Sequence, residues 1–404
     1  MVNRNIPGQS PSGLRATRRT ALGLLLGTPL LSGCSTVQNF LGGDSSGSSS
    51  EPTPGGPPVQ GSVLGEGQVK VGLILPLSAA GSAGQAGMSM RNAAELALSE
   101  FRTANIQLLV KDDGATAQGA QQAAQQAVSE GASIILGPVF AQMVAQVAQV
   151  ARGHNIPVIS FSTDSSVAGR DVYLLSFMPE SDVRRIVDYS AGIGKRSFAA
   201  LIPDTAYGSV VEAAFKTTVP QHSGRVAAFE KYGSDRVRPA TTVAQALGSA
   251  DALFIADGGE GVVAITDALT AAGANLSRIQ LLGTGQWDDP RIFAAPALRG
   301  GLYSAPDPAG FKSFAARYRA KYNTEPVRTA TLVYDAVALV AALARAEAAQ
   351  RFTAEVLTNP SGFTGIDGLF RFRKDGTNER GLAVMKVGAE VGVLVAGSPK
   401  SFGG

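Results

Sequence analysis

From Val69 onward, short runs of apolar residues alternate with longer segments in which apolar residues recur every three or four positions. The first run, VKVGLILPL, is almost continuously apolar, which is typical of a strand buried on both faces. The next segment, GMSMRNAAELALSEF, has apolar residues at helical spacing: Met88, Ala93, Leu96, Ala97 and Phe101. The alternation continues with the predicted strands NIQLLVKDD, SIILGP and IPVISFS and the predicted helices QGAQQAAQQAVSEG and VAQVAQVARGHN. This order predicts a doubly wound parallel sheet.

A second set of elements follows VYLLSFMPESD. Its predicted strands are SFAALIPD, GRVAAFEKY, ADALFIAD and RIQLLGTG, and its helices are YGSVVEAAFKTTVP, ATTVAQALGS and GVVAITDALTAAG. One sheet with all these strands would be unusually wide, so the pattern favours two α/β lobes. The remaining residues predict a strand, two helices and a final hairpin with an Asp375-Gly376 turn: GGLYSAP, AGFKSFAARYRAKYN, RTATLVYDAVALVAALARAE and GLFRFRKDGTNERGLAVMKV.

The N-terminal segment has the composition of an export signal. Four arginines and no acidic residue precede an apolar run from Ala21 to Leu31. This run is about half of the roughly 20 residues that a membrane-spanning helix needs. A positive region, a short apolar run and small residues together predict a cleaved signal peptide over residues 1–33. Thr17-Arg18-Arg19 leaves the twin-arginine route open beside the general export route.

The single cysteine of the chain, Cys34, stands at the end of this signal. Leu31-Ser32-Gly33-Cys34 resembles the bacterial lipobox, in which the cysteine receives a diacylglycerol and becomes the first mature residue. The resemblance implies that Cys34 is lipidated and that the protein reaches the membrane only through this anchor. Residues 34–68 include a stretch of Gly, Ser and Pro and are predicted to be a flexible tether.

Loss of the signal peptide changes the charge of the chain. The whole chain has a formal net charge of +3, and removal of its four N-terminal arginines leaves −1. No block of Lys and Arg with interleaved aromatic residues follows, so we expect no nucleic-acid binding. The mature chain has no second cysteine for an internal disulfide, and its stability is expected to come from two buried cores.

The sequence contains no complete catalytic or metal-binding motif. The two histidines, His154 and His222, form no ligand spacing such as H-E-x-x-H. A P-loop and an S-x-x-K motif are also missing. The adjacent pairs Asp112-Asp113 and Asp288-Asp289 point in different directions on any regular element and are predicted to be turn or cap residues. We therefore expect neither catalysis nor a cofactor, with a carboxylate pair assembled across a cleft as the open alternative.

Four loops that follow predicted strands are rich in glycine and small side chains: LSAAGSAGQAG, GPVF, SFSTDSS and ADGGEG. Such loops gather at one edge of an open α/β sheet, beside helix N-termini that favour polar ligands. Glycine lets the backbone approach a ligand and Ser and Thr supply uncharged donors, although the same residues also cap helices. The predicted ligand-binding residues are Ser78, Ala79, Pro138, Val139, Phe140, Ser160, Phe161, Ser162, Thr163, Tyr207, Asp257, Gln286 and Trp287.

The order of the elements and several local stretches resemble the type I periplasmic solute-binding proteins of the leucine/isoleucine/valine receptor kind. The stretches are VGLILPLSAAG, ILGPVF, IPVISFSTD, PDTAYG, YDAVALVAALARA and the final G..G.FRF...G hairpin. The resemblance implies two doubly wound parallel-sheet lobes joined by three crossovers, with a ligand held between the lobes at strand ends.

The resemblance also implies boundaries for the two lobes. The three crossovers are expected near Met178–Asp182, Gly283–Trp287 and Gly362–Asp367. Lobe 1 then comprises residues 69–180 and 286–364, and lobe 2 comprises residues 181–285 and 365–404. Because Trp287 would lie at a crossover, lobe closure is expected to change its exposure and therefore its emission.

The implied function is that of a periplasmic receptor, which traps a small polar solute such as an amino acid and presents it to an ABC permease. Family members that hold amino acids offer hydroxyl groups to the ligand carboxylate and an acid to its ammonium group. Here Ala141 has no hydroxyl, and Asp164 would repel a carboxylate unless it points away or is paired. Gly285 or Gln286 stands where the acid is expected. These departures argue against a free amino acid.

The resemblance extends to the penicillin-binding protein activators, which are lipoproteins with this fold that contact peptidoglycan synthases. Ser35 follows the expected lipidated cysteine, and a neighbour other than Asp goes with outer-membrane sorting in many Gram-negative cells. An outer-membrane anchor suits an activator better than an importer receptor. We keep the receptor as the first interpretation, because the resemblance covers the whole domain.

Overall fold

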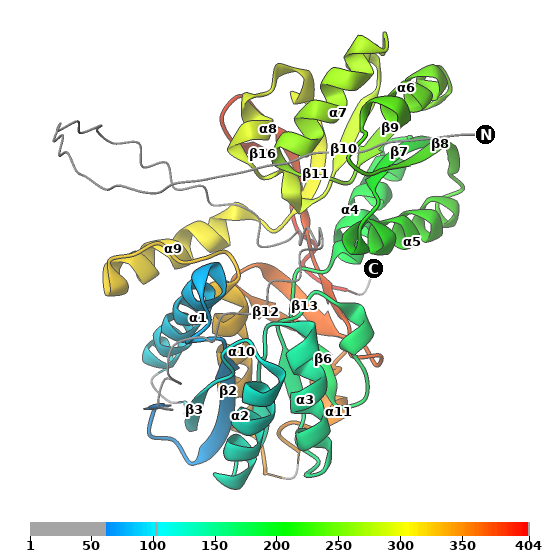
Figure 1. Ribbon diagram of the computed structural model, residues 1–404. Helices are drawn as coiled ribbons and strands as arrows, with labels where there is room; N and C mark the ends of the chain where they lie inside the picture. Colours follow the sequence, from blue (N-terminus) through cyan, green and yellow to red (C-terminus); the bar gives the residue numbers. More distant parts are fainter. Residues whose placement is uncertain (1–61, 102–103, 349, 403–404) are drawn as a thin grey trace, which may run out of the picture. The chain divides into compact units, whose positions relative to one another are not determined.

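The computed structural model describes residues 62–101, 104–348 and 350–402. The predicted signal peptide, Cys34 and most of the predicted tether lie outside these residues. The strands form a six-stranded, a seven-stranded and a three-stranded sheet, shown in Figure 1. We call the six-stranded sheet with its helices lobe 1, and the seven-stranded sheet with its helices lobe 2. The predicted fold class of two α/β lobes is confirmed.

Lobe 1 is built on a sheet with strand order β1-β3-β2-β4-β5-β6, parallel except for β1. Strand β2 is buried except at Lys70, because helices cover both faces of the sheet. The strands are β1 Ser62–Leu64, β2 Val69–Leu75, β3 Ile106–Asp112, β4 Ile134–Leu136, β5 Val158–Ser160 and β6 Val172–Leu174. The helices are α1 Gly81–Glu100, α2 Ala117–Ser129, α3 Ala141–Arg152, α9 Pro308–Tyr322, α10 Ala330–Leu343 and α11 Ala354–Leu357.

Lobe 2 is built on a sheet with strand order β16-β15-β11-β10-β9-β7-β8. Strands β7 to β11 run parallel, and β15 and β16 add an antiparallel edge. The strands are β7 Ser197–Pro203, β8 Arg225–Tyr232, β9 Ala252–Ile255, β10 Gln280–Gly283, β11 Leu302–Ala305, β15 Ala383–Val387 and β16 Gly392–Ala396. The helices are α4 Pro179–Gly192, α5 Ala206–Gln221, α6 Val237–Ala246, α7 Gly259–Ala271 and α8 Pro290–Ala294.

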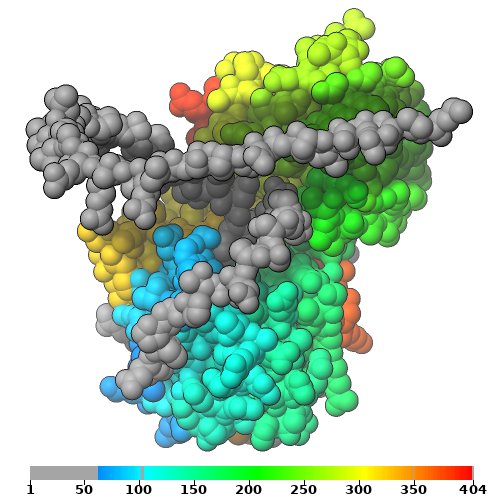
Figure 2. Space-filling model, in the orientation of Figure 1, coloured from blue at the N-terminus to red at the C-terminus, as the bar shows by residue number. Residues whose placement is uncertain are grey.

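Each large sheet has a separate apolar core on each face. In lobe 1, α1 and α10 cover one face and α2 and α3 cover the other. In lobe 2, α4 and α5 cover one face and α6, α7 and α8 cover the other. Figure 2 shows the lobes in space-filling form, with the first half of lobe 1 in blue and cyan and most of lobe 2 in green and yellow. No helix in the described ranges is long and apolar enough to cross a membrane.

The chain changes lobes at places that differ in part from the sequence-based boundaries. It leaves lobe 1 between β6 and α4, which agrees with the expected crossover near Met178. The second crossover was expected at Gly283–Trp287, but β10 and β11 on either side of that segment are parallel neighbours in the same sheet. The chain leaves lobe 2 only after β11, between Ala305 and Pro308.

The third crossover also comes later than Gly362–Asp367. The three-stranded sheet consists of β12 Phe363–Gly365, β13 Gly368–Phe372 and β14 Asn378–Arg380. Its Phe370 and Phe372 belong to the core of lobe 1. The predicted hairpin turn joins β13 to β14, whereas AVMKV forms β15 in lobe 2. The chain therefore crosses between Arg380 and Ala383, because the apolar side chains of β13 pack on lobe 1.

The C-terminal residues return from lobe 2 to the three-stranded sheet. The guanidinium of Arg371 lies 4.5 Å from the ring centroid of Phe402, and a Cβ at Gly362 would lie 2.9 Å from the same ring. This fourth passage between the lobes was not predicted. The short 3-10 helices are η1 Ser165–Val167, η2 Leu247–Ser249, η3 Leu276–Arg278, η4 Gly285–Trp287 and η5 Pro296–Leu298.

Candidate functional site

The strand-end loops of lobe 1 are held together by a buried serine. Ser160, at the end of β5, donates its hydroxyl to the carbonyl of Pro138 after β4 at 3.0 Å. Its Oγ accepts the N–H of Ser162 at 3.1 Å, and the residue is fully buried. Gly137 permits this close packing: its φ is +95°, and a Cβ there would lie 2.1 Å from the carbonyl oxygen of Ile74. Ser160 is thus placed to fix the two loops and does not face solvent.

The loop after β5 contains an exposed hydroxyl group. Ser162 is buried, and its Oγ accepts the N–H of Asp164 at 3.1 Å. Asp164 accepts both the N–H and the hydroxyl of Ser166 on Oδ1, at 2.9 and 2.6 Å. The Asp164 carboxylate is therefore engaged by the 3-10 helix that follows it. Thr163 is exposed and has no hydrogen-bond partner among the described residues, so its hydroxyl is available to a ligand.

The other predicted residues of lobe 1 belong mostly to its packing. Val139 and Phe161 lie in the core beside α10, Pro138 is buried, and Phe140 and Ala79 are half-buried. Ser78 donates its backbone N–H to Asp112 Oδ1 at 3.1 Å, and Gly114 donates to the same oxygen at 2.9 Å. The turn between β2 and α1 is therefore tied to the end of β3 by the Asp112 carboxylate.

Lobe 2 presents two tyrosines at its strand ends. The hydroxyl of Tyr207, at the start of α5, lies 2.9 Å from Thr284 Oγ1 after β10. Tyr232, at the end of β8, donates its hydroxyl to Asp257 Oδ2 after β9 at 2.9 Å. Burial and the carboxylate of Asp182 raise the pKa of Tyr207, and burial and Asp257 raise the pKa of Tyr232. Both phenols therefore stay neutral donors at physiological pH.

A half-buried carboxyl group that the sequence did not single out, Asp182, lies beside Tyr207. Asp182, in the first turn of α4, accepts the hydroxyl of Ser304 on Oδ1 at 3.0 Å. Burial raises the pKa of Asp182 to about 7, and Glu180 adds to the rise. The hydroxyl of Ser304 and the N–H of Gly285 act in the opposite direction. The sequence feature that could have indicated Asp182 is its position in the first turn of the helix that follows the first crossover.

Asp257 and Gln286 both lie against Gly258, just before the start of α7. Asp257 Oδ1 accepts the N–H of Gly258 at 2.8 Å, and a Cβ at Gly258 would lie 3.0 Å from Gln286 Oε1. Two further charged residues stand at this helix start and were missed from the sequence. Arg291 binds Asp289 at 2.6 Å and lies 3.9 Å from Glu260, whose side chain is 83% exposed. The sequence feature that could have indicated this charged pair is the glutamate, Glu260, within the predicted loop ADGGEG.

Trp287 does not occupy the position expected for it. The indole is fully buried in the core of lobe 2, where a Cβ at Gly283 would lie 2.1 Å from its ring. Its Nε1 has no hydrogen-bond partner among the described residues. The strands on either side of Trp287, β10 and β11, pair in the same sheet. Trp287 therefore packs in the core of lobe 2 against this sheet and does not line a crossover.

A family model described as periplasmic binding protein matches residues 68–391, which is most of the chain. The chain belongs to the periplasmic binding protein family. This match confirms the resemblance that the strand-end stretches indicated. The chain of this periplasmic binding protein also matches a curated but uncharacterized protein of Rickettsia prowazekii, with 23% identity over 120 residues. That match covers 30% of this chain and 32% of the relative, so it spans about a third of the relative's length.

Solved structures share the fold of this periplasmic binding protein. A branched-chain amino acid ABC transporter periplasmic ligand-binding protein from Burkholderia xenovorans has a TM-score of 0.65 and 17% identity, covering 83% of this chain and 97% of that one. A leucine binding protein from Thermotoga maritima has a TM-score of 0.56 and 19% identity, covering 81% of this chain and 98% of that one. A Rhodopseudomonas palustris solute binding protein in complex with 3,4-dihydroxybenzoic acid has a TM-score of 0.57 and 20% identity, covering 81% of this chain and 96% of that one.

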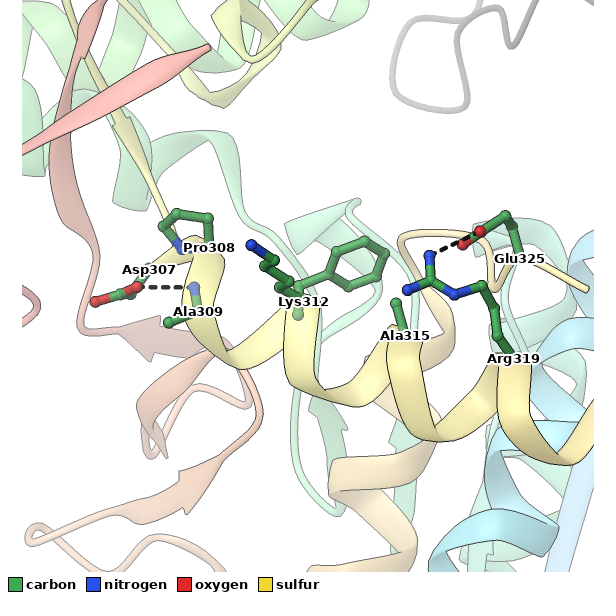
Figure 3. Close-up of a pocket in the computed structure, with 8 residues that line it drawn as sticks. Asp307, Pro308, Ala309, Lys312, Ala315, Arg319 and Glu325 are labelled. Carbon is green, nitrogen blue, oxygen red and sulfur yellow. Dashed lines mark hydrogen bonds and ion pairs between the residues drawn. The ribbon is translucent and has the colours of Figure 1, made fainter.

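One hollow of this periplasmic binding protein lies elsewhere, along α9 (Figure 3). It measures about 480 Å³ and is lined by Pro308, Phe311 and Ala315, together with the charged residues Asp307, Lys312, Arg319 and Glu325. Arg319 there is paired with Glu325 at 2.8 Å, and Asp307 caps the helix by accepting the N–H of Ala309. None of the predicted ligand-binding residues lines it. The described residues contain no cluster of His, Cys, Asp and Glu suited to a metal ion.

Proposed function

We propose that the protein binds a small polar solute between the carboxyl-terminal strand edges of lobes 1 and 2, without converting it chemically, and delivers it to an ABC permease. The observation that carries the proposal is that both sheets end in loops with polar groups facing solvent, in a chain that matches the periplasmic binding protein family over residues 68–391. Loops at strand carboxyl ends are where open α/β sheets bind ligands.

The two edges favour a ligand with both acceptor and donor groups. In lobe 1, the exposed Thr163 hydroxyl can donate to a carboxylate or hydroxyl oxygen of the solute. The two bonds from Ser166 fix the Asp164 carboxylate against the 3-10 helix that follows it, while its negative charge remains. In lobe 2, Asp257 and the exposed Glu260 can accept from an ammonium or hydroxyl group.

Carboxylic acids are therefore the first compounds to test. The structural relatives include a leucine binding protein and a protein solved with 3,4-dihydroxybenzoic acid, and both of these ligands carry a carboxylate. A panel of branched-chain and polar amino acids, aromatic carboxylates, short peptides and cell-wall peptides covers the proposed chemistry. A true ligand at a hundredfold excess over its dissociation constant stabilises the folded state by about 2.7 kcal/mol, which thermal unfolding detects.

Variants at the two edges locate the binding site of any compound that stabilises the protein. Thr163→Val removes the exposed hydroxyl of lobe 1, and Thr324→Val is its control at another exposed threonine of the same lobe. Tyr207→Phe removes a hydroxyl of lobe 2, and Tyr189→Phe is its control. We expect the first member of each pair to weaken binding in calorimetry and the control to leave it unchanged. If both Thr163→Val and Tyr207→Phe bind the ligand as tightly as the unaltered protein does, the ligand lies outside these edges.

The proposed anchor is tested separately. If Cys34 is acylated, the intact mass of membrane-extracted protein corresponds to a chain that begins at Cys34 and carries lipid. Cys34→Ser should then release the protein from the membrane fraction without changing the folded domain. A chain that retains Arg18 and Arg19 would contradict the proposed processing.

The regulator alternative rests on Ser35, which follows the proposed lipidated residue and favours the outer membrane. Purified peptidoglycan synthase and the purified protein, mixed directly, distinguish the two functions. Binding to the synthase together with no stabilisation by any compound of the panel would favour the regulator over the receptor.

A further inference from the structure

Five side chains connect the three crossovers on the lobe 1 side. The guanidinium carbon of Arg328 lies 4.6 Å from the ring centroid of Phe177 and 4.7 Å from that of Phe311. The guanidinium carbon of Arg380 lies 4.9 Å from the same Phe177 ring and 5.5 Å from the ring of Phe370. We call these five residues the arginine–aromatic cluster. Its contacts form a continuous series in which Phe177 is shared by both arginines.

Each crossover contributes one member of the cluster. Phe177 stands between β6 and α4, where the chain first leaves lobe 1. Phe311 lies near the start of α9, just after the chain returns, and Arg380 ends β14, just before the chain leaves again. The other two members belong to lobe 1 itself, Arg328 in the loop before α10 and Phe370 in β13. The cluster therefore brings together three segments that are far apart in the sequence.

Arg328 has a fixed orientation within the cluster. Its two terminal nitrogens donate to the two carboxylate oxygens of Asp367 at 2.9 and 2.6 Å. The Asp367 side chain is fully buried, and Thr331 donates its hydroxyl to the same carboxylate at 2.6 Å. A bidentate pair of this kind sets the plane of the guanidinium. Arg328 therefore presents a defined surface to the rings of Phe177 and Phe311.

Arg380 holds the first crossover through its backbone as well as through its ring. Its Nε donates to the carbonyl of Ser176 at 3.0 Å, and Asn378 Nδ2 donates to the same carbonyl at 2.9 Å. Ser176 immediately precedes Phe177. Two side chains of β14 thus bind the segment that leads out of β6, so the first and third crossovers are joined directly.

The other end of the Arg380 guanidinium depends on the aromatic contacts. Arg380 is only 5% exposed, and its Nη1 and Nη2 have no hydrogen-bond partner among the described residues. Burial lowers the pKa of Arg380, and the carboxylates of Asp367 and Asp335 counter this through space. A cation over an aromatic ring is attracted more strongly when both are removed from water. The rings of Phe177 and Phe370 therefore stabilise a buried charge that hydrogen bonds satisfy only in part.

We propose that the arginine–aromatic cluster couples the three crossovers, so that they open and bend as one unit and not one by one. Because Phe177 contacts both arginines, displacing the first crossover disturbs the contacts of Arg328 with Phe311 and of Arg380 with β14. The lobe 2 side adds a second link, since Arg185 of α4 donates from Nε to the carbonyl of Leu382 in the third crossover at 2.7 Å.

Hydrogen exchange of the full chain, measured by mass spectrometry without ligand, tests this coupling independently of the proposed solute. Phe177→Leu keeps most of the apolar volume but removes the ring face that both arginines contact. Exchange should become about tenfold faster in residues 176–181, 305–311 and 380–383 together, because a desolvated contact of a cation with a ring contributes on this scale. Phe311→Leu should likewise speed exchange in the first and third segments, which do not carry the substitution.

Phe101→Leu is the matched control. Phe101 is also a partly buried phenylalanine packed against the lobe 1 core, where its ring lies 6.5 Å from that of Tyr334. This variant should leave the three crossover segments unchanged. Phe177→Tyr keeps a ring face for both arginines and should restore the exchange of the unaltered chain.

Strand β9 in lobe 2 serves as an internal reference for loss of folding. Its amides should exchange at the same rate in every variant, because the cluster lies in and beside lobe 1. Faster exchange only in the crossover that carries the substitution would overturn the proposal. An equal rise in β9, or a Phe177→Tyr variant that behaves like Phe177→Leu, would overturn it as well.

Discussion

The strand-end edges of the two lobes are built from different kinds of hydrogen bond. In lobe 1, polar side chains bind the backbone of nearby loops: Ser160 binds Pro138 and Ser162, and Asp112 binds Ser78 and Gly114. In lobe 2, side chains bind side chains from other elements, as in Tyr207 with Thr284, Tyr232 with Asp257 and Ser304 with Asp182. Lobe 1 thus has a fixed backbone surface, whereas lobe 2 has a network of phenols and carboxyl groups.

This difference assigns separate tasks to the two edges. The lobe 1 edge, with its backbone fixed by its own side chains, offers a ligand mainly its shape and the exposed hydroxyl of Thr163. A network that contains Asp182, with a pKa raised to about 7, changes its charge near physiological pH. We therefore expect the lobe 2 edge to respond to pH near 7 through Asp182, and the lobe 1 edge to respond at lower pH through Asp113, whose pKa burial raises to about 6.

The largest expected effect comes from Trp287, on which the lobe 2 edge rests. Trp287→Ala empties a fully buried site in the lobe 2 core and should lower the free energy of unfolding by about 3–5 kcal/mol. Trp287→Phe fills part of the site and should cost less. Urea unfolding followed by circular dichroism measures both. If Trp287→Ala lowered the free energy of unfolding by less than a typical surface substitution does, the indole would not support the edge.

Ser160→Ala tests the backbone-fixing role of lobe 1. The change leaves the carbonyl of Pro138 and the N–H of Ser162 without their buried partner, and the free energy of unfolding should fall by about 2 kcal/mol. Ser129→Ala, which removes an exposed hydroxyl bonded within α2, is the control and should have little effect. Urea unfolding of the two variants side by side gives the difference.

Asp182→Asn tests the pH response of lobe 2. The raised pKa means that the folded state favours the protonated carboxyl, so this contribution to stability is present below pH 3.8 and is lost as the pH rises through about 7. An amide has no charge to bury, and the variant should gain about 1–2 kcal/mol relative to the wild type at pH 8 and nothing at pH 3.

Thermal unfolding at pH 3, 6 and 8 measures this gain, with the exposed Asp267→Asn as control. A constant difference between Asp182→Asn and the wild type across the pH range would contradict the assignment. The buried Asp113 and Asp335 of lobe 1, whose pKa values burial raises to about 6 and about 7, contribute equally to both proteins and cancel in the comparison.

The smallest expected effect is that of Tyr207→Phe on the unliganded protein. The ring stays in place and the change removes the hydrogen bond between Tyr207 and Thr284, so the free energy of unfolding should fall by about 1 kcal/mol. Thr284→Val should give a similar loss, and the double variant should lose less than the sum of the two. Full additivity in this cycle, measured by urea unfolding, would show that the two hydroxyls do not interact.

The sequence determined the local features of the protein. The alternation of buried strands and amphipathic helices gave two α/β lobes, and the strand-end loops rich in Gly, Ser and Thr marked where polar groups gather. It also indicated that Asp164 would repel a carboxylate unless it points away or is paired, and Ser166, two residues away, donates two hydrogen bonds to it. Such features depend on φ, ψ and side chains within a few residues, which the order of residues specifies directly.

Only the tertiary structure decided which strands share a sheet and which side chains meet. It placed β11 beside β10 and moved two crossovers, because parallel pairing joins strands that lie far apart in sequence. It buried Trp287 beneath a strand edge, and it brought Asp182 to Ser304 across 122 residues. It also left β16 at an open edge with four apolar side chains exposed. Contacts of this range depend on the packing of whole elements, which no local pattern encodes.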